Sequence, residues 1–297
     1  MSLFHHPDIP ADLKASTAAS LAFLAFTAVS FLLALLWAVR HAKRDGNWMP
    51  LSLLAGGFLL GFCEPIGDLM GATFYPEQPL RVLNILNRQI PLYVFVGESM
   101  FVASGVYLGY RLLAERASVL RLWGVVALFA LFDSAMEMTL AHFNVMNYYG
   151  HNPVLILGLP AYSVIQNGAL VVAGGWFLLL FRPLLHGKGV LLAVPLCLQG
   201  FVVLVGLGTW PMYLALNTGQ GHAALLTAGI VSVVLNAAIT WYFVTRHPLE
   251  IPWRGQIVSS VGRFCRIEPK WDEEPAKRVH AGSAPGGPTQ TVFLGRA

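Results

Sequence analysis

The sequence carries little charge. Only 11% of its 297 residues are Asp, Glu, Lys or Arg, and 56% are hydrophobic, whereas about 25% charged residues is usual for a soluble domain. Long apolar runs at this charge content are typical of a polytopic helical membrane protein. The segments of about ten residues with alternating polarity that indicate a β-barrel are missing. We therefore expect a multi-pass integral membrane protein whose main partner is the lipid bilayer.

Cysteine is also scarce, and three common kinds of site lack their sequence signal. Cys63, Cys197 and Cys265 show none of the paired spacings of disulfide frameworks or zinc sites. No basic run with interleaved aromatic residues suggests nucleic acid as a partner. We expect neither a metal nor another cofactor. The first apolar run is too long for a cleavable signal peptide, and no basic segment precedes it.

Seven segments have the roughly 20 apolar residues that a transmembrane helix needs. They extend over residues 17–39, 48–72, 91–113, 120–145, 160–182, 189–215 and 222–245. We therefore predict an all-α polytopic bundle of about seven transmembrane helices within residues 1–247. Residues 248–297 are rich in Pro, Gly and charge, and we expect a largely disordered cytoplasmic tail.

The basic residues are distributed unevenly between the two sides of this bundle. All of the 19 Lys and Arg residues except Lys14, Arg81 and Arg88 fall on the side that holds the C-terminal tail. The positive-inside rule then predicts a cytoplasmic C-terminus and an N-terminus outside. The sequence does not indicate an oligomeric state.

Five carboxyl groups interrupt the predicted spans, although a charge in hydrocarbon costs about 2.5–3.5 kcal/mol on insertion scales. They belong to Glu64, Asp68, Glu98, Asp133 and Glu137. At a rise of about 1.5 Å per residue, they lie between the middle of the bundle and its outer face. No Lys or Arg lies in the interior of a span to neutralise them. We expect them to be catalytic groups around a pocket that opens toward the outer leaflet.

Other polar and aromatic residues reach a similar depth in the later spans. We expect Gln166, Asn167, Trp210, Tyr213 and Asn236 to bind the substrate. The alternative for the amide side chains is an interhelical hydrogen bond, worth about 0.6 kcal/mol on average. The alternative for Asp68 is a position at the outer membrane interface. Pro65, between Glu64 and Asp68, removes a backbone donor and predicts a kink there.

Two outer connections contain apolar residues that do not form spans. Residues 75–90 mix apolar and polar side chains, which suggests an interfacial helix or a lid. The apolar run 154–157 is too short to span a bilayer. It either re-enters the bundle or lies on its surface.

Carboxyl groups in an apolar, aromatic pocket indicate a particular chemistry. Burial disfavours the charged form of a carboxyl group, so the group keeps a proton that it can donate near neutral pH. Aromatic faces stabilise a neighbouring cation. These properties suit protonation of an olefin or epoxide in a lipophilic substrate.

In its seven spans and intramembrane acids, the chain resembles the small integral-membrane terpene cyclases of meroterpenoid pathways. The resemblance implies protonation-initiated cyclisation of an isoprenoid. The chain is also similar in style to the emopamil-binding sterol isomerase group, whose intramembrane acids handle a carbocation. The likeness is one of layout and assigns no role to any residue. The Asp-rich diphosphate motif of ionising terpene synthases is absent, so departure of pyrophosphate is not expected.

Other functions remain open. A proton-coupled transporter or a small-molecule-binding membrane protein would use the same acids as relay or ligand groups, and a structural or assembly partner would tolerate their loss. A metal enzyme would use Asp133, Glu137 and His142, with His151 or His222 from neighbouring loops. The spacing of five residues from Glu137 to His142, however, does not suit one helical face. A retinal protein of the usual kind is excluded, because no span interior offers a Lys.

Overall fold

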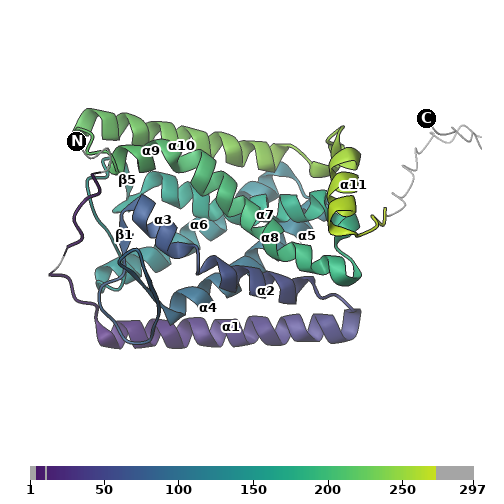
Figure 1. Cartoon of the computed structure of the whole chain (residues 1–297), viewed down its shortest axis with the longest axis horizontal. Helices are drawn as coiled ribbons and strands as arrows, with labels where there is room; N and C mark the ends of the chain where they lie inside the picture. Colours follow the sequence, from purple (N-terminus) through teal and green to yellow (C-terminus); the bar gives the residue numbers. More distant parts are fainter. Residues whose placement is uncertain (1–4, 11, 272–297) are drawn as a thin grey trace, which may run out of the picture.

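The chain folds mainly into long helices that lie side by side. The structure, a computed structural model, describes residues 5–10 and 12–271, and most of these are helical. Figure 1 shows the helices along the longest axis, with α1 (Thr17–Asp45) at one long edge and α10 (His222–Thr245) at the other. The prediction of an all-α chain is confirmed at this level.

Six helical runs among the described residues are long and apolar enough to cross a membrane, which is compatible with a multi-pass membrane protein. They are Thr17–Asp45, Leu92–Ala114, Val119–His142, Ala161–Leu180, Gly187–Leu216 and His222–Thr245. Of these, Val119–His142 is α6 and Ala161–Leu180 is α7. A seventh crossing exists if α2 (Met49–Leu60) and α3 (Glu64–Gly71) form one span.

The break between α2 and α3 has a local cause. The two helices are bent by 49° relative to one another. Pro65 lies in the first turn of α3, where a missing N–H is tolerated but an unbroken helix is not continued. The predicted kink in this segment is confirmed, and it separates the apolar α2 from the part that carries Glu64 and Asp68.

Two of the long runs contain a wider helical turn. In the first, η1 (Val102–Val106) is π-helical and joins α4 (Leu92–Phe101) to α5 (Tyr107–Ala114). In the second, η3 (Gly187–Leu192) and α8 (Ala193–Phe201) precede the π-helical η4 (Val202–Gly208) and α9 (Thr209–Leu216). Such turns often occur at functional sites.

Helix α7 is the centre of the bundle, and most of its residues are buried. Its packing against α5 depends on residues without side chains. A Cβ added to Gly109 would lie 2.1 Å from the carbonyl oxygen of Val171, and one added to Gly175 would lie 2.3 Å from the backbone nitrogen of Tyr110. The two backbones therefore touch, as small residues allow in membrane helices.

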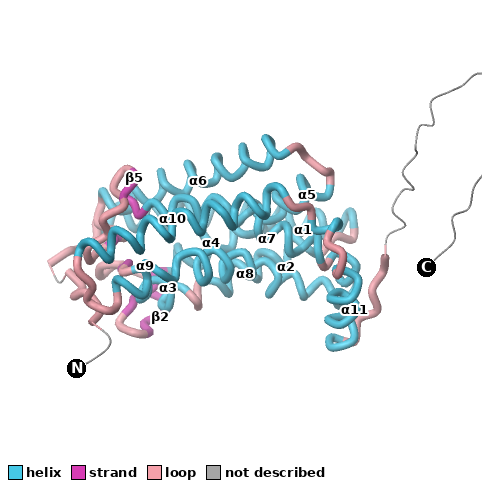
Figure 2. Tube along the Cα trace, turned by 90° about the horizontal axis from the view of Figure 1, so that it is seen from above, coloured by secondary structure: helices cyan, strands magenta, loops and turns pink. Residues whose placement is uncertain are grey.

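Short β-pairs gather at the end of the bundle where α1 begins (Figures 1 and 2). The antiparallel pairs are β1 (Thr73–Phe74) with β4 (Asn147–Tyr148), β2 (Arg81–Ile85) with β3 (Arg88–Pro91), and β5 (Leu155–Ile156) with β6 (Leu159–Pro160). Where an interfacial helix or lid was predicted, the chain therefore forms a hairpin. Its two turn residues, Leu86 and Asn87, have φ of 56° and 57°, which a two-residue hairpin turn requires.

A buried arginine ties the N-terminal segment to this end. Arg88 is only 2% exposed, and its guanidinium donates to Nε2 of His6 at 2.8 Å and to the hydroxyl of Tyr149. Nδ1 of His6 lies 2.6 Å from Oδ1 of Asn217, and Nδ2 of Asn217 donates to the carbonyl of Met70. These contacts join β3 and α3 to the residues that directly follow β4 and α9.

The opposite end carries α11 (Arg254–Cys265), which lies across the direction of the long helices in Figure 1. This helix falls within the range predicted to be largely disordered, so the structure differs from the expectation there. Val258 and Gly262 bury one face of α11, and the backbone N–H of Lys270 donates to the carbonyl of Pro183 at 2.8 Å. Residues 272–297 of the predicted tail lie outside the described part of the chain.

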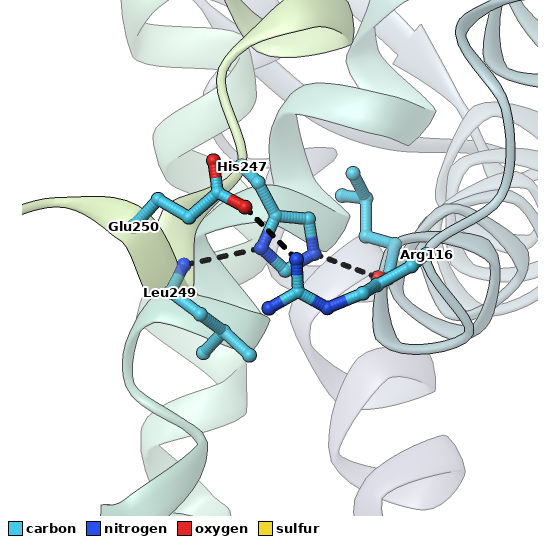
Figure 3. Close-up of polar contacts among 5 residues, drawn as sticks. Arg116, His247, Leu249 and Glu250 are labelled. Atoms are coloured by element: carbon cyan, nitrogen blue, oxygen red, sulfur yellow. Dashed lines mark hydrogen bonds and ion pairs between the residues drawn. The ribbon is translucent and has the colours of Figure 1, made fainter. Parts of the chain in front are cut away.

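The chain leaving α10 is held by polar contacts (Figure 3). His247 donates from Nε2 to the carbonyl of Leu113 at 2.9 Å, while its Nδ1 accepts from the backbone N–H of Leu249 at 3.4 Å. Arg116 pairs with Glu250 at 2.8 Å. These contacts fix η5 (Pro248–Glu250) against the connection between α5 and α6.

Candidate functional site

A cavity of about 200 Å³ lies among α1, α3, α4, α6, α7 and α9, toward the end with the β-pairs. This is far more than the roughly 10–15 Å³ that one water molecule needs. The cavity brings together residues from the two halves of the chain, from Phe23 to Tyr213. It is therefore a product of the whole bundle.

All five carboxyl residues predicted from the sequence line this cavity. Helix α3 supplies Glu64 and Asp68, α4 supplies Glu98, and α6 supplies Asp133 and Glu137. No Lys, Arg or His is among the described residues that line it. The cavity thus combines five acids with no basic group at its wall.

The acids of α6 face two polar residues of α7. Asn167 donates from Nδ2 to Oδ2 of Asp133 at 2.7 Å, and the same nitrogen lies 3.4 Å from Oε1 of Glu137 and from the hydroxyl of Ser163. Asp133 and Glu137 are four residues apart, as are Ser163 and Asn167, so each pair shares one face of its helix. Asn167, predicted to bind substrate, is thus placed to orient both acids.

Tyr148 is a second partner of Glu137, which the sequence analysis did not propose. Its hydroxyl donates to the two carboxylate oxygens at 3.0 and 3.1 Å and lies 3.1 Å from the hydroxyl of Ser163. Burial, and then the charge of Glu137, hold the pKa of Tyr148 well above that of an ordinary phenol. The hydroxyl therefore keeps its proton and acts as the donor.

The pairing of β1 with β4 brings Tyr148 to the cavity. In this register Thr73 lies opposite Tyr148, across 75 residues of sequence, and both residues line the cavity. Nothing in the spacing of Tyr148 along the chain reveals this contact. The one available signal is a tyrosine directly after a predicted span that carries two acids.

The α3 side of the cavity is less fully hydrogen-bonded. Asp68 is 4% exposed, and its Oδ2 has no hydrogen-bond partner among the described residues. Its side chain is therefore buried within the bundle. Arg88 acts on Asp68 electrostatically, although the two do not form an ion pair in the part of the chain that the structure describes. A buried, incompletely paired carboxyl group is costly, and it leaves an oxygen available to a ligand.

The remaining predicted binding residues are divided between the cavity and its surroundings. Gln166 and Tyr213 line the cavity, and Gln166 accepts a hydrogen bond from Thr209 at 2.7 Å. Asn236 is fully buried behind them and donates to Thr209 at 2.9 Å. Trp210 is 53% exposed. The structure therefore does not bring Asn236 or Trp210 to the cavity, and Asn236 makes the interhelical hydrogen bond that was the alternative for it.

Aromatic rings form much of the remaining wall. The rings come from α1, α4, α6, α8, α9 and the segments around β1 and β4. They include Phe23, Phe26, Tyr75, Tyr93, Phe101, Phe132, Tyr148, Phe201 and Tyr213. Their faces can stabilise a positive charge that develops in a bound molecule. The cavity therefore offers both carboxyl groups and π-systems to one ligand.

The described residues contain no group of three or more His, Cys, Asp or Glu side chains arranged to hold a metal ion. His142, from the alternative metal set, is exposed. His151 and His222 instead contact each other, with Nε2 and Nδ1 2.6 Å apart on the surface.

Comparison with protein-family models, with curated proteins and with solved structures finds no match to the chain. The function must therefore be inferred from the site.

Proposed function

We propose that the protein is an intramembrane enzyme that cyclises or isomerises a lipophilic, isoprenoid-like substrate by protonation. The observation that carries this proposal is the group of five carboxyl side chains around one aromatic cavity, with no basic residue among the described residues of its wall. The proposal takes α2 and α3 as one broken span, which gives seven spans with the N-terminus outside and the C-terminus in the cytoplasm.

The reaction needs at least two carboxyl groups in different protonation states, one protonated and one ionised. A protonated carboxyl transfers its proton to an olefin or epoxide, and its O–H bond breaks. In the olefin, the electrons of the π bond form a C–H bond; in the epoxide, the oxygen takes the proton and one C–O bond of the ring opens. The resulting carbocation is stabilised by a neighbouring carboxylate and by aromatic faces. A second carboxylate then removes a proton from carbon, and the electrons of that C–H bond form a new double bond. The product is an isomer of the substrate.

Asp133 and Glu137 are the best placed pair for the proton transfers. Asn167 donates to Asp133 at 2.7 Å, and Tyr148 donates to both oxygens of Glu137. These donors fix the orientation of the carboxyl groups, and orientation is a large part of acid–base catalysis. Glu64, Glu98 and Asp68 on the facing helices complete the acidic wall.

One observation favours a second function. Because no described wall residue is basic, a lipophilic organic cation would also be bound by the carboxylates, as in a transporter or a small-molecule-binding protein. That function needs binding or flux but no chemical conversion.

Lipid extracts distinguish the two functions. Cells expressing the wild type, Glu64→Gln, Asp133→Asn or the exposed control Glu77→Gln are extracted and compared by untargeted mass spectrometry. The enzyme proposal expects a species in the wild type and the control that is replaced in the two cavity variants by an accumulated isomer. Identical extracts from equally abundant, folded proteins would contradict it and favour binding or transport.

A further inference from the structure

The cavity reaches the side of the bundle. Phe26 of α1 and Phe132 of α6 both line it, yet their side chains are 45% and 40% exposed. Where a residue lines the cavity on one side and is exposed on the other, only its side chain separates the cavity from the outside, and we take this place as the opening. Both residues lie well inside long apolar helices, so the opening is on the lipid-facing side of the proposed bundle.

The outer limit of this opening is a backbone hydrogen bond. Ser16, which caps the start of α1, donates from its backbone N–H to the carbonyl of Phe143 at 3.2 Å. Phe143 is the residue after the end of α6. The two helices are therefore joined at this end. At the same end, Gln78 donates from Nε2 to the carbonyl of Val145 at 3.0 Å.

The inner limit is a contact between aromatic rings. Phe101 of α4 and Phe129 of α6 meet edge to face, with their centroids 5.3 Å apart. Gly105 also lies against Phe129, because a Cβ there would be 2.8 Å from its ring. At this contact α6 packs against η1. Phe132 lies one helical turn from Phe129, closer to the acids.

Helix α4 forms the back of the opening, and α1 covers part of it. A Cβ on Gly97 would lie 3.5 Å from the methyl group of Thr27, and Phe23 packs edge to face on Tyr93 at 5.0 Å. Both Gly97 and Thr27 line the cavity. The opening thus lies between α1 and α6, with α4 behind it.

We propose that this opening, bounded by Ser16–Phe143 and Phe101–Phe129, is where an apolar chain passes from the bilayer to the carboxyl groups. In the bound state the reactive group lies beside Asp133 and Glu137, while the rest of the chain lies between Phe26 and Phe132. The passage itself is independent of catalysis; the assignment of the chain as a substrate rests on the proposed function.

The surroundings of the opening select the ligand. α1 contains no charged residue before Arg40. Elsewhere on the two flanking helices, the exposed residues Leu33 of α1 (63%) and Leu131 of α6 (70%) are also apolar, although neither lines the cavity. Moving a phosphate or diphosphate through an apolar passage would leave its charge without a partner. The ligand class is therefore a long, uncharged hydrocarbon chain with its double bond or epoxide near one end.

Two carbodiimides test the passage without requiring turnover. Protein in liposomes is treated either with dicyclohexylcarbodiimide, which dissolves in the bilayer, or with its water-soluble ethyl-dimethylaminopropyl analogue. Peptide mass spectrometry then measures the adducts on Asp133 and Glu137. We expect the lipophilic reagent to label these residues and the water-soluble one to leave them unlabelled. Faster labelling by the water-soluble reagent would overturn the proposal.

Matched variants locate the passage. Phe26→Trp/Phe132→Trp enlarges both side chains and should slow lipophilic labelling by about tenfold or more, whereas Phe26→Ala/Phe132→Ala should accelerate it. Leu33→Trp/Leu131→Trp changes the same two helices outside the cavity and should have no effect. If both Trp pairs slow the labelling equally, or if neither pair slows it, the result would contradict a passage at this place.

The labelling and the lipid extracts fail in different ways. Site-specific labelling together with unchanged extracts would support the passage and reject the enzyme. In that case the apolar chain is a bound or transported ligand. If the extracts change but neither Trp pair alters the rate of lipophilic labelling, the results would support the enzyme and reject this route.

Discussion

Asn167 of α7 donates a hydrogen bond to Oδ2 of Asp133 on α6 at 2.7 Å, from the nitrogen that also lies 3.4 Å from Glu137. One amide therefore sets the relative position of two acids on another helix. The hydrogen bond is made to a group that titrates, so its strength depends on the protonation state of the site.

Asn167→Leu removes this donor at similar size. We expect conversion to fall by about 10- to 100-fold, because a misplacement of about 1 Å has effects of this order. The free energy of unfolding should fall by about 1–3 kcal/mol, the usual effect of leaving a buried acceptor unpaired. Asn236→Ala is the control: it removes the hydrogen bond to Thr209 outside the cavity. An Asn167→Leu variant that keeps full conversion would contradict the orienting role of Asn167.

Tyr148→Phe removes the hydroxyl that donates hydrogen bonds to both carboxylate oxygens of Glu137. We expect product formation to fall while the protein stays folded, with a loss of about 1 kcal/mol in stability. Because the pKa of Tyr148 is raised by its burial, its hydroxyl remains a donor at neutral and moderately alkaline pH.

The neighbouring tyrosine provides the control for this variant. Tyr149→Phe removes a hydroxyl that contacts Arg88 and His6, so it should affect stability more than conversion. Both variants are compared by initial rates in membranes and by thermal unfolding in detergent. The opposite ranking of their rates would show that Tyr148 does not position the acid.

Arg88→Met tests the buried arginine at the end with the β-pairs. The change removes the guanidinium that donates to His6 and Tyr149, and we expect a loss of about 1–3 kcal/mol in the free energy of unfolding. Arg81→Met, on the same hairpin, alters an exposed residue paired with Glu77 and should change stability by less than about 0.5 kcal/mol. Thermal unfolding of the two purified variants gives the comparison; similar midpoints would argue against a stabilising role for Arg88.

Gly175→Ala tests the close approach of α5 and α7. The added methyl group would lie 2.3 Å from the backbone nitrogen of Tyr110, and overpacking of this kind costs about 1–3 kcal/mol. Gly124→Ala is a matched control on α6, where a Cβ meets no atom within 4 Å and the better helix propensity should contribute up to about 1 kcal/mol. The two variants should therefore shift the unfolding midpoint in opposite directions.

The depth of a residue in a long apolar helix follows from counting along the sequence. Counting residues along the predicted spans therefore placed Glu64, Glu98 and Asp133 at a similar depth, and the structure brings them to one cavity. The absence of basic residues in the span interiors supplied the second clue, because unpaired acids avoid lipid.

Rotation about a helix axis is harder to predict when most of its faces are apolar. Trp210 and Tyr213 lie on the same short helix, α9, yet Trp210 is 53% exposed and Tyr213 is 8% exposed. Nothing in the local apolar pattern distinguishes them. The same limit applies to Asn236, whose contact with Thr209 depends on how α9 and α10 pack.

Contacts between distant short segments were not predictable either. The β1–β4 pair that positions Tyr148 has two residues in each strand, too few for an alternating pattern. In the hairpin, Leu86 adopts a positive φ that sequence preferences assign to Gly, Asn or Asp. Tertiary contacts, such as those of Arg88, determine these segments.

The π-helical η1 gives one run an extra residue in a single turn. Each residue of an α-helix advances the helix by about 100°. Deleting one residue from Val102–Val106 would restore an ordinary turn and rotate Glu98 relative to α5 by that amount. Glu98 would then turn away from the cavity that it lines now, while α5 kept its contact with α7. The grouping of the five acids therefore depends on this π-helical turn. A regular α-helix of the same length would not bring Glu98 to the other four.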